Sequence, residues 1–207
     1  NTQYVFIINP DTIFKYNTIK NIFDEAKLID DFAIISPVNT DLNYPNYKTS
    51  NKILNKNIIE VDSVDGFAML INKQKFEENN YFDENFFLFL ENDDLCKRIK
   101  TAGNKIYVIK NAFIDHKGFS SSTIMNKEEL ELLRNWHWMW SKFYFNKKHY
   151  GFFQAFISAL PSFFSSMLKI LIFTLLLNKK KRKIYQFRFF GILNSVIGKT
   201  SWYRIKD

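Results

Sequence analysis

Short apolar runs and helix-period patterns alternate along the first half of the chain. Residues 4–8 form a continuous apolar run that ends in a polar turn at residues 9–11. A short run of this kind predicts a buried strand, which would place Asp11 at its carboxyl end. Apolar residues then recur at spacings of three and four over residues 19–26, which predicts a helix capped by Asn17.

The same kind of pattern continues to about residue 116. We expect further strands at residues 32–36, 58–61, 67–72, 106–109 and 112–114. An Asn-rich segment with Pro45 predicts a loop over residues 38–52, and a short helix is expected over residues 73–78.

A longer helix is expected to begin near Glu91 and to end at Gly103. The spacing of Leu95, Ile99 and Ala102 predicts that these three residues form its inner face. Because strands and helices alternate in this way, the sequence favours an α/β fold with a layered sheet.

The pattern changes after residue 122. An aromatic and basic helix is expected over residues 128–150, and an amphipathic helix with an aromatic end over residues 187–207. Between them, residues 150–177 contain one charged residue, Lys169, and one helix breaker, Pro161. This stretch is long enough to cross a bilayer once, since roughly 20 apolar residues suffice. Pro161, Ser165, Ser166 and Lys169 also permit two helices at the membrane interface, and we favour interfacial binding or re-entry over a true span.

Composition and charge narrow the classes of partner. A chain of 207 residues can form one domain with an appendage. Its net charge of +8 favours anionic partners, namely nucleic acid, acidic lipid or a phosphorylated substrate. The basic run at residues 179–183 directly follows the apolar stretch, so we expect it to face anionic lipid on the cytoplasmic side. The single cysteine, Cys96, excludes an internal disulfide and favours a reducing compartment.

Asp11 and His116 are candidate ligands of a divalent metal. Each follows an expected strand, and separate strands of one sheet can bring their carboxyl ends together. A carboxylate with an imidazole suits Mg²⁺ or Mn²⁺, and a diphosphate would complete the shell. The alternative is that Asp11 bonds its own backbone in a turn and that His116 is an ordinary surface or packed histidine.

Glu91, Asp93 and Asp94 are candidate general bases. Carboxylates within four residues of one another oppose each other's ionisation, which can poise one of them to accept a proton. The alternative is structural, because acidic residues stabilise the first turn of a helix and Asn92 is a good N-cap. Asp94 would then form an ion pair with Arg98 on a solvated face.

In combination these segments resemble the family 2 glycosyltransferases, particularly the rhamnosyltransferase-like members. The resemblance covers about residues 3–122 and rests on four motifs in order. They are NPD at 9–11, DG before a hydrophobic strand at 65–66, FDENFFLFLENDDLCKR at 82–98 and AGNKIYVIKNAFIDH at 102–116. The segments HYG at 149–151 and GKTSWYR at 198–204 are similar to the tail of that subgroup, with less specificity.

The resemblance implies a GT-A fold, a nucleotide-activated sugar donor and inversion at the anomeric carbon. Asn9 and Asp11 match the family's variant DxD motif, with Asp11 in the metal-binding position. His116 matches the histidine that completes the metal shell. Asp65 and Gly66 match the turn that lines the pocket for donor sugar and acceptor.

The acidic cluster matches the family's base motif with one departure. The usual base position holds Asn92, and a carboxamide cannot accept a proton at neutral pH, so the role would pass to Asp94, Glu91 or Asp93. The family's nucleotide-binding half also precedes the NPD strand. We therefore expect that the chain is part of a longer enzyme.

These features predict two regions: residues 1–122 as the C-terminal part of a Rossmann-like GT-A domain with a mixed sheet, and residues 123–207 as a helical, membrane-associating region. The expected activity is sugar transfer to a lipid-linked glycan at the cytoplasmic face of a bacterial inner membrane, with rhamnose as the suggested sugar. A non-catalytic, membrane-tethered module that binds glycan or nucleotide is the alternative. We expect no nucleic-acid partner, because the positive charge concentrates beside the apolar stretch.

Overall fold

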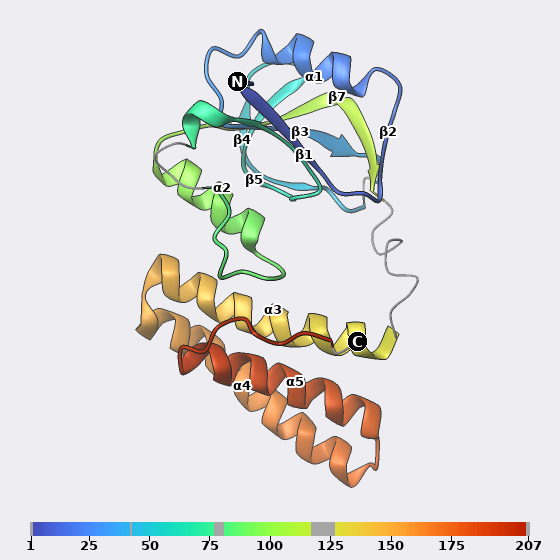
Figure 1. Ribbon diagram of the computed structural model, residues 1–207, viewed down its shortest axis with the longest axis vertical. Helices are drawn as coiled ribbons and strands as arrows, with labels where there is room; N and C mark the ends of the chain where they lie inside the picture. Colours follow the sequence, from blue (N-terminus) through green and yellow to red (C-terminus); the bar gives the residue numbers. More distant parts are fainter. Residues whose placement is uncertain (1, 42, 77–80, 117–126, 206–207) are drawn as a thin grey trace. The chain divides into compact units, whose positions relative to one another are not determined.

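The computed structural model describes residues 2–41, 43–76, 81–116 and 127–205 (Figure 1). The chain divides into two compact units. The first, called here the sheet unit, comprises Asn1–Asp83 with Glu91–Thr123, and the second, the helical unit, comprises Glu84–Leu90 with Ile124–Asp207.

The sheet unit is α/β and contains a mixed seven-stranded sheet. Its strands are β1 (Tyr4–Ile8), β2 (Thr12–Phe14), β3 (Ile34–Asn39), β4 (Tyr47–Ile53), β5 (Ile58–Val64), β6 (Ala68–Asn72) and β7 (Ile106–His116). The order across the sheet is β1-β6-β3-β7-β5-β4, and β2 pairs with β7. The β3–β7 pairing is parallel and the others are antiparallel.

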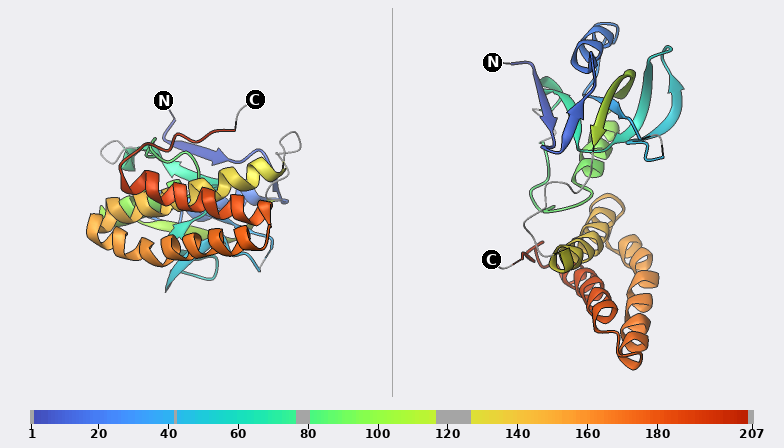
Figure 2. Two further views of the ribbon diagram at one scale, coloured as in Figure 1. Left: turned by 90° about the horizontal axis from the view of Figure 1, so that it is seen from below. Right: turned by 90° about the vertical axis from the view of Figure 1, so that its right-hand side faces the viewer.

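Helices α1 (Thr18–Ala26) and α2 (Glu91–Thr101) cover opposite faces of this sheet (Figures 1 and 2). Successive residues of the central strands alternate between the two faces, as Ile34 packs in the core cluster that contains Leu95 and Ile35 in the one that contains Ile22. Every residue of β3 and β6 is buried. Continuous apolar runs are what a sheet covered on both faces requires.

The structure confirms the expected strands at residues 4–8, 32–36, 58–61 and 67–72 and the helices after Asn17 and at Glu91, with small shifts at their ends. Four expectations for the sheet unit were wrong. Asn17 does not cap α1 through its side chain, which makes no capping hydrogen bond. Part of the loop over 38–52 is strand β4, and residues 106–116 form one strand, β7, where two were expected. Ala102 is exposed beyond the end of α2.

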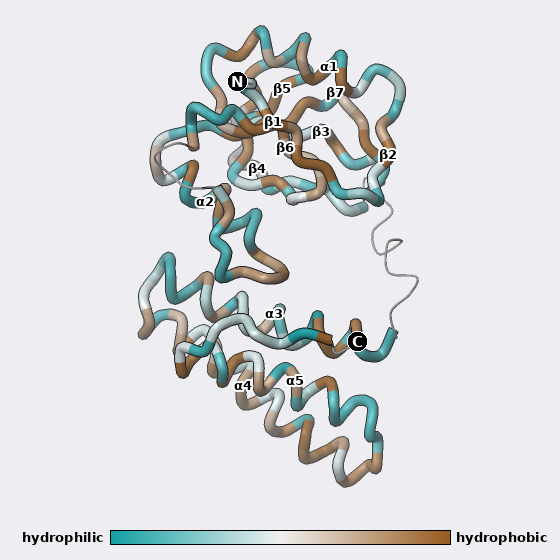
Figure 3. Tube along the Cα trace, in the orientation of Figure 1, coloured by the Kyte–Doolittle hydropathy of each residue, from teal (hydrophilic) through white to brown (hydrophobic). Residues whose placement is uncertain are grey.

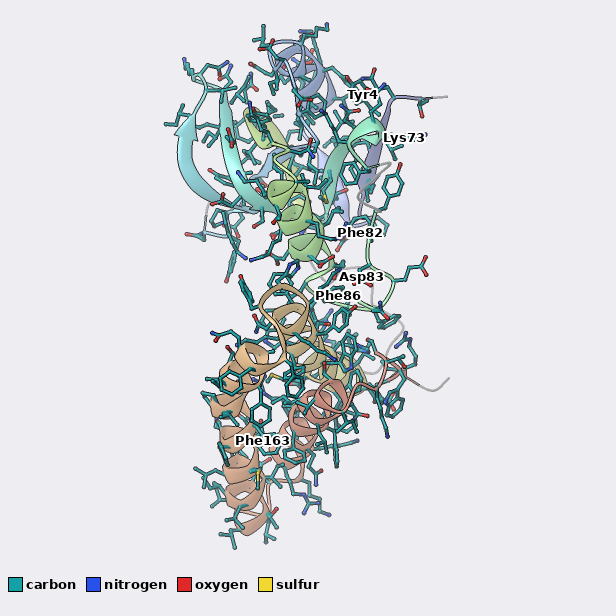
Figure 4. The ribbon with its side chains drawn as sticks, turned by 90° about the vertical axis from the view of Figure 1, so that its left-hand side faces the viewer. Tyr4, Lys73, Phe82, Asp83, Phe86 and Phe163 are labelled. Atoms are coloured by element: carbon teal, nitrogen blue, oxygen red, sulfur yellow. The ribbon has the colours of Figure 1, made fainter. Side chains whose placement is uncertain are left out.

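Three helices form the helical unit: α3 (Lys127–Tyr150), α4 (Phe152–Leu175) and α5 (Lys179–Val196). Each packs against the other two. Close approach of α5 to α3 depends on Gly191, because a Cβ atom there would lie 2.3 Å from the carbonyl oxygen of Trp136. Between α4 and α5, the rings of Phe163 and Phe189 lie 4.8 Å apart (Figure 4).

Helix α4 is a single helix of 24 residues that includes Pro161, so the division of this stretch into two helices, which the sequence permitted, does not occur. The helix expected over residues 187–207 was wrong in its bounds, because α5 ends at Val196. By length and composition it could cross a membrane, with a mean hydropathy of 1.7 over its most apolar window. Figure 3 shows the hydrophobic residues along α4 and the hydrophilic start of α5. The exposed apolar side chains of α4 recur at spacings of three and four and include Phe153, Ile157, Phe164, Leu168, Leu171 and Leu175.

The basic run at residues 179–183 forms the first turn of α5. Part of its charge is already paired within the helical unit. Lys180 lies 3.2 Å from Glu131, and Lys183 lies 3.9 Å from Glu128, both on α3. Fewer positive charges of this run are therefore available for anionic lipid than the five cationic residues in its sequence.

Candidate active site

The turn at residues 65–67, between β5 and β6, is where the predicted site residues meet. The Asn9 N–H donates to the Phe67 carbonyl at 2.9 Å, and the Phe67 ring stacks on the His116 ring at 4.5 Å. On the other side of the turn, the Asn92 side chain donates to the Val64 carbonyl at 2.9 Å. A Cβ atom on Gly66 would lie 3.4 Å from the Asn92 Cβ, so the turn packs directly on the start of α2.

Asp11 and His116 are brought together by the pairing of β2 with β7. Thr12 lies opposite His116 in this ladder, and Asp11 precedes it. The Asp11 Oδ1 and His116 Nε2 atoms lie 3.4 Å apart, with side chains 9% and 25% exposed. Thr12 closes the turn at residues 9–12, since its hydroxyl and its N–H both donate to the Asn9 carbonyl, at 2.7 and 3.3 Å. Asp11 is therefore directed at the histidine.

This pair fits two positions of a divalent metal shell. Two adjacent ligands of an octahedral ion, each about 2.1 Å from it, are roughly 3 Å apart. The observed separation needs only a small adjustment to reach that value. The described residues contain no group of three His, Cys, Asp or Glu that could hold a metal ion. A metal at Asp11 and His116 would therefore depend on substrate or water oxygens for its remaining ligands.

Glu91 opens α2 and has the features of a proton acceptor. Its Oε2 atom is buried and has no hydrogen-bond partner among the described residues. Burial raises the pKa of the Glu91 carboxyl, and the charge of Asp93 raises it further, against the effect of a backbone N–H. A carboxyl with a raised pKa and an unused oxygen is suited to general-base catalysis.

Asp93 and Asp65 share one electrostatic environment with His116. Lys48 lies 3.0 Å from Asp93. The pKa of Asp65 is raised by burial and by Asp93, whereas Lys48 and His116 lower it. Because more than a third of Asp65 is exposed, solvent screens these effects. These four ionisable groups lie near one another, around the turn after β5.

Asp94 has a different environment from the other two acidic candidates. Its side chain is fully buried, and its Oδ2 atom lies 2.9 Å from the Arg98 Nε. Arg98 also donates to the Tyr81 carbonyl. The expected ion pair is therefore present, but it is buried where a solvated face was expected. Such a carboxylate holds the first turns of α2 in place and cannot reach an acceptor hydroxyl in this conformation.

Two further observations bear on the start of α2. Asn92 is the second residue of the helix, so the expectation that it forms the N-cap was wrong. Burial raises the pKa of the Cys96 thiol to about 12, which excludes it as a nucleophile at neutral pH.

Sequence reasoning did not identify Lys48 or Phe67 as members of this site. Lys48 lies in the segment expected to be a loop, and its contact joins residues 45 positions apart, so no local pattern marks it. Phe67 follows Asp65 and Gly66 directly, and it was assigned only to the core of a strand.

No family model matches the chain. The chain is similar to the rhamnosyltransferase WbbL of Escherichia coli (strain K12), with 27% identity over 130 aligned positions that cover 52% of this chain and 49% of that protein. The chain spans about half the length of the curated relative that it matches. This similarity supports a glycosyltransferase-like relationship.

Proposed function

We propose that the protein is an inverting glycosyltransferase of family 2 with a partial GT-A fold. It transfers a sugar from a nucleoside diphosphate donor to a hydroxyl group of a lipid-linked glycan. The observation that carries the proposal is the turn at residues 65–67, around which the Asp11–His116 pair and the acidic start of α2 gather. The similarity to a rhamnosyltransferase makes rhamnose, as its thymidine diphosphate derivative, the first donor to test.

In this proposal Asp11 and His116 hold Mg²⁺ or Mn²⁺. When bound, the ion supplies positive charge to the diphosphate leaving group. Asn9, Asp65 and Gly66 line the side of the site on which the donor sugar lies. The carboxylate of Asp65 accepts hydrogen bonds from sugar hydroxyls.

Glu91 is the proposed base. It takes the proton of the acceptor hydroxyl as the acceptor oxygen forms a bond to the anomeric carbon. The bond from that carbon to the diphosphate oxygen breaks with its electron pair, and the nucleoside diphosphate leaves. Attack from the face opposite the leaving group inverts the anomeric centre. Asp93, paired with Lys48, supports this site through its charge, and Asp94 holds α2.

The acceptor's lipid places the reaction at a membrane. We propose the cytoplasmic face of a bacterial inner membrane, where nucleotide sugars and lipid-linked glycans for surface polysaccharide synthesis meet. Helix α4 supports this proposal by its length, its apolar composition and its exposed apolar side chains. The unpaired cations of the 179–183 run would contact anionic headgroups.

The test uses protein expressed from its complete reading frame, a thymidine diphosphate rhamnose donor and a membrane extract as acceptor source. We expect Mn²⁺-dependent formation of a lipid-linked product, lost in Glu91→Gln and in His116→Ala. Asp62→Asn, at an exposed carboxylate outside the site, is the matched control. If this donor and the corresponding uridine and guanosine diphosphate sugars all give no product, the transferase proposal is wrong.

The alternative, a non-catalytic membrane-tethered binding module, is favoured by one observation: the residue at the usual base position, Asn92, is engaged in a backbone hydrogen bond. Donor binding without turnover in both the parent protein and Glu91→Gln would support that alternative.

A further inference from the structure

One cleft lies entirely within the helical unit. It has a volume of about 340 Å³, and its walls come from the segment that precedes α2 and from the C-terminal tail. The residues used below are Glu84, Phe87, Thr200, Trp202 and Arg204. This volume is at the lower end of the range for small-molecule sites, about 300–1000 Å³.

Both walls are fixed to α3 by hydrogen bonds. On the tail side, the fully buried His137 bonds the Tyr203 carbonyl through Nε2 at 2.8 Å and the Ser201 hydroxyl through Nδ1 at 3.0 Å. Since a carbonyl only accepts, Nε2 carries the proton and Nδ1 accepts from Ser201. Burial lowers the pKa of His137 to about 4, so the ring stays neutral and this pattern persists at physiological pH.

The opposite wall is held in a similar way. The Ser141 hydroxyl donates to the Leu88 carbonyl at 2.8 Å, and the Phe86 ring meets the Tyr144 ring edge-on at 5.0 Å (Figure 4). Phe89 and Leu90, the next residues, both have φ 68°, a left-handed conformation that is costly for side chains of this size. The cleft is therefore built from constrained segments.

Arg204 and Glu84 supply the charged groups of the cleft. The Arg204 guanidinium lies over the Phe87 ring, 3.4 Å from its centroid, and its Nη1 donates to the Ser201 and Tyr203 carbonyls at 2.6 and 2.8 Å. Neither Arg204 nor the exposed Glu84 has an ion-pair partner in the part of the chain that the structure describes. A guanidinium donor and a carboxylate acceptor are thus both available to a ligand.

The aromatic surface of the cleft is Trp202. Its side chain is 55% exposed although its indole N–H donates to the Asn194 side chain at 3.2 Å and its ring meets Trp136 edge-on at 5.8 Å. The ring is thus fixed while part of it faces solvent. Aromatic faces carry negative charge density that attracts the weakly positive C–H groups of a pyranose ring.

We propose that this cleft binds a sugar ring of the acceptor glycan. Sugar hydroxyls both donate and accept, so they match the Arg204 guanidinium and the Glu84 carboxylate together, while the ring stacks on Trp202. An apolar ligand would leave both charges desolvated, and a lone phosphate would be opposed by Glu84. The inference rests on the proposed function, because the Glu84 wall is continuous in sequence with Glu91, the proposed base.

The test is binding of small glycosides to the 207-residue chain, followed by saturation-transfer NMR and tryptophan fluorescence. The probes are the methyl glycosides of glucose, galactose, mannose and N-acetylglucosamine, with inorganic pyrophosphate as a separate anionic probe. We expect saturable binding of at least one glycoside, weakened tenfold or more by Trp202→Ala and by Arg204→Gln. Trp138→Ala is the matched control, since Trp138 is 41% exposed and does not line the cleft.

Glu84→Gln should also weaken binding. We expect this variant to fold, because Glu84 is exposed and has no ion-pair partner among the described residues. The proposal is overturned if no glycoside binds, if Trp138→Ala weakens binding as much as Trp202→Ala, or if pyrophosphate displaces the glycoside from the cleft. Each of these results would overturn only the proposal for the cleft. If Mn²⁺-dependent donor turnover is still observed, the proposed function stands. If instead glycosides bind but no donor turnover is observed, the proposed function is refuted and the proposal for the cleft is not.

Discussion

Asp94 and Glu91 lie three residues apart in α2 but in opposite environments, so replacing each by its amide should separate stability from chemistry. Asp94→Asn keeps the shape of the side chain and removes the charge that faces Arg98 at 2.9 Å. Glu91→Gln removes a carboxyl whose Oε2 atom has no partner among the described residues. We expect the first change to weaken the fold and the second to abolish transfer.

The magnitude for Asp94→Asn follows from burial. Breaking a fully buried ion pair costs about 3–5 kcal/mol. Arg98 is 20% exposed, and an amide oxygen can still accept from its Nε, so the expected loss is smaller, about 2 kcal/mol. With an m value of about 2 kcal/mol/M in urea, the unfolding midpoint of the sheet unit should fall by about 1 M.

Glu91→Gln should change the free energy of unfolding at neutral pH in the direction opposite to Asp94→Asn. A carboxyl whose pKa is raised in the folded state favours folding when it is protonated, and this contribution is lost as pH rises through the folded pKa. At pH 7 the ionised Glu91 therefore weakens the fold, and Gln removes that penalty. The variant should be at least as stable as the parent at pH 7, with the difference vanishing below the unfolded pKa of about 4.3.

The assay must report on the sheet unit. All four tryptophans belong to the helical unit, so their fluorescence follows the wrong part of the chain. Hydrogen exchange of the buried β3 and β6 amides in urea measures the relevant unfolding. Asp24→Asn is the matched control, because Asp24 forms the exposed i,i+4 pair with Lys20 and should cause no measurable shift.

Two results would refute the reasoning. If Asp94→Asn unfolds at the same urea concentration as Asp24→Asn, the buried pair does not stabilise α2. If Asp94→Asn remains folded and loses transfer while Glu91→Gln retains it, the base is Asp94.

Three further substitutions test other parts of the molecule, and a pH profile tests the role of Glu91. His116→Ala should weaken Mn²⁺ binding at least tenfold by calorimetry, with Asp62→Asn unchanged. Leu95→Ala, at a side chain with no exposed surface, should lower the stability of the sheet unit by about 3 kcal/mol in the exchange assay. Leu168→Glu, on the exposed face of α4, should reduce flotation with anionic vesicles at least tenfold without loss of helix by circular dichroism. Since the pKa of Glu91 is raised, kcat/KM should fall on the acid side at a pH above the ordinary carboxyl range, and a fall only near pH 4 would contradict this.

The central strands could be predicted from sequence because their signal and their environment agree. Every residue of β3 and β6 is buried, and the apolar residues at the start of β3 and along β6 agree with that burial. Ser36 and Asn39 of β3 are polar and also buried, so the apolar pattern did not predict that this strand continues to Asn39. Strand β4, by contrast, is an edge strand with the polar sequence YKTSNKI, and it forms through pairing with β5 across register shifts. Strand propensity is weak where packing does not demand apolar residues.

The division of β7 into two strands failed for a related reason. Lys110 and Asn111 interrupt the apolar pattern, and such an interruption is typical of a break between two strands. In the structure the Lys110 N–H donates to the Asn57 carbonyl, and the Asn111 carbonyl accepts from the Asn21 side chain. Contacts with residues far away in sequence thus satisfy the backbone through the polar pair. The pairing with β3 also shifts register at Pro37 and Val38, near this point.

Sequence reasoning expected Asp11 and His116 to lie close together, but for a different reason from the one observed. It relied on the carboxyl ends of two strands, whereas the pair forms because β2, a strand that was not expected, pairs antiparallel with β7 and lies with Thr12 opposite His116. The roles within the acidic cluster could not be predicted from the helix pattern alone. The Asp94–Arg98 ion pair follows from the i,i+4 spacing, but the burial of Asp94 depends on how α2 packs in the sheet unit, where Asp94 and Leu95 are both among the buried residues of the helix.

Asn92 anchors the start of α2 to the end of β5. Its amide donates to the Val64 carbonyl at the end of β5, which ties the second residue of α2 to the turn before Gly66. A carboxylate at position 92 could only accept a hydrogen bond, so it would face a carbonyl oxygen at about the same distance and repel it. The carboxamide is thus required by the local geometry, and a base at this position would disrupt the contact that aligns the site. We therefore assign the proposed base to the neighbouring carboxylate, Glu91, whose Oε2 atom has no hydrogen-bond partner among the described residues.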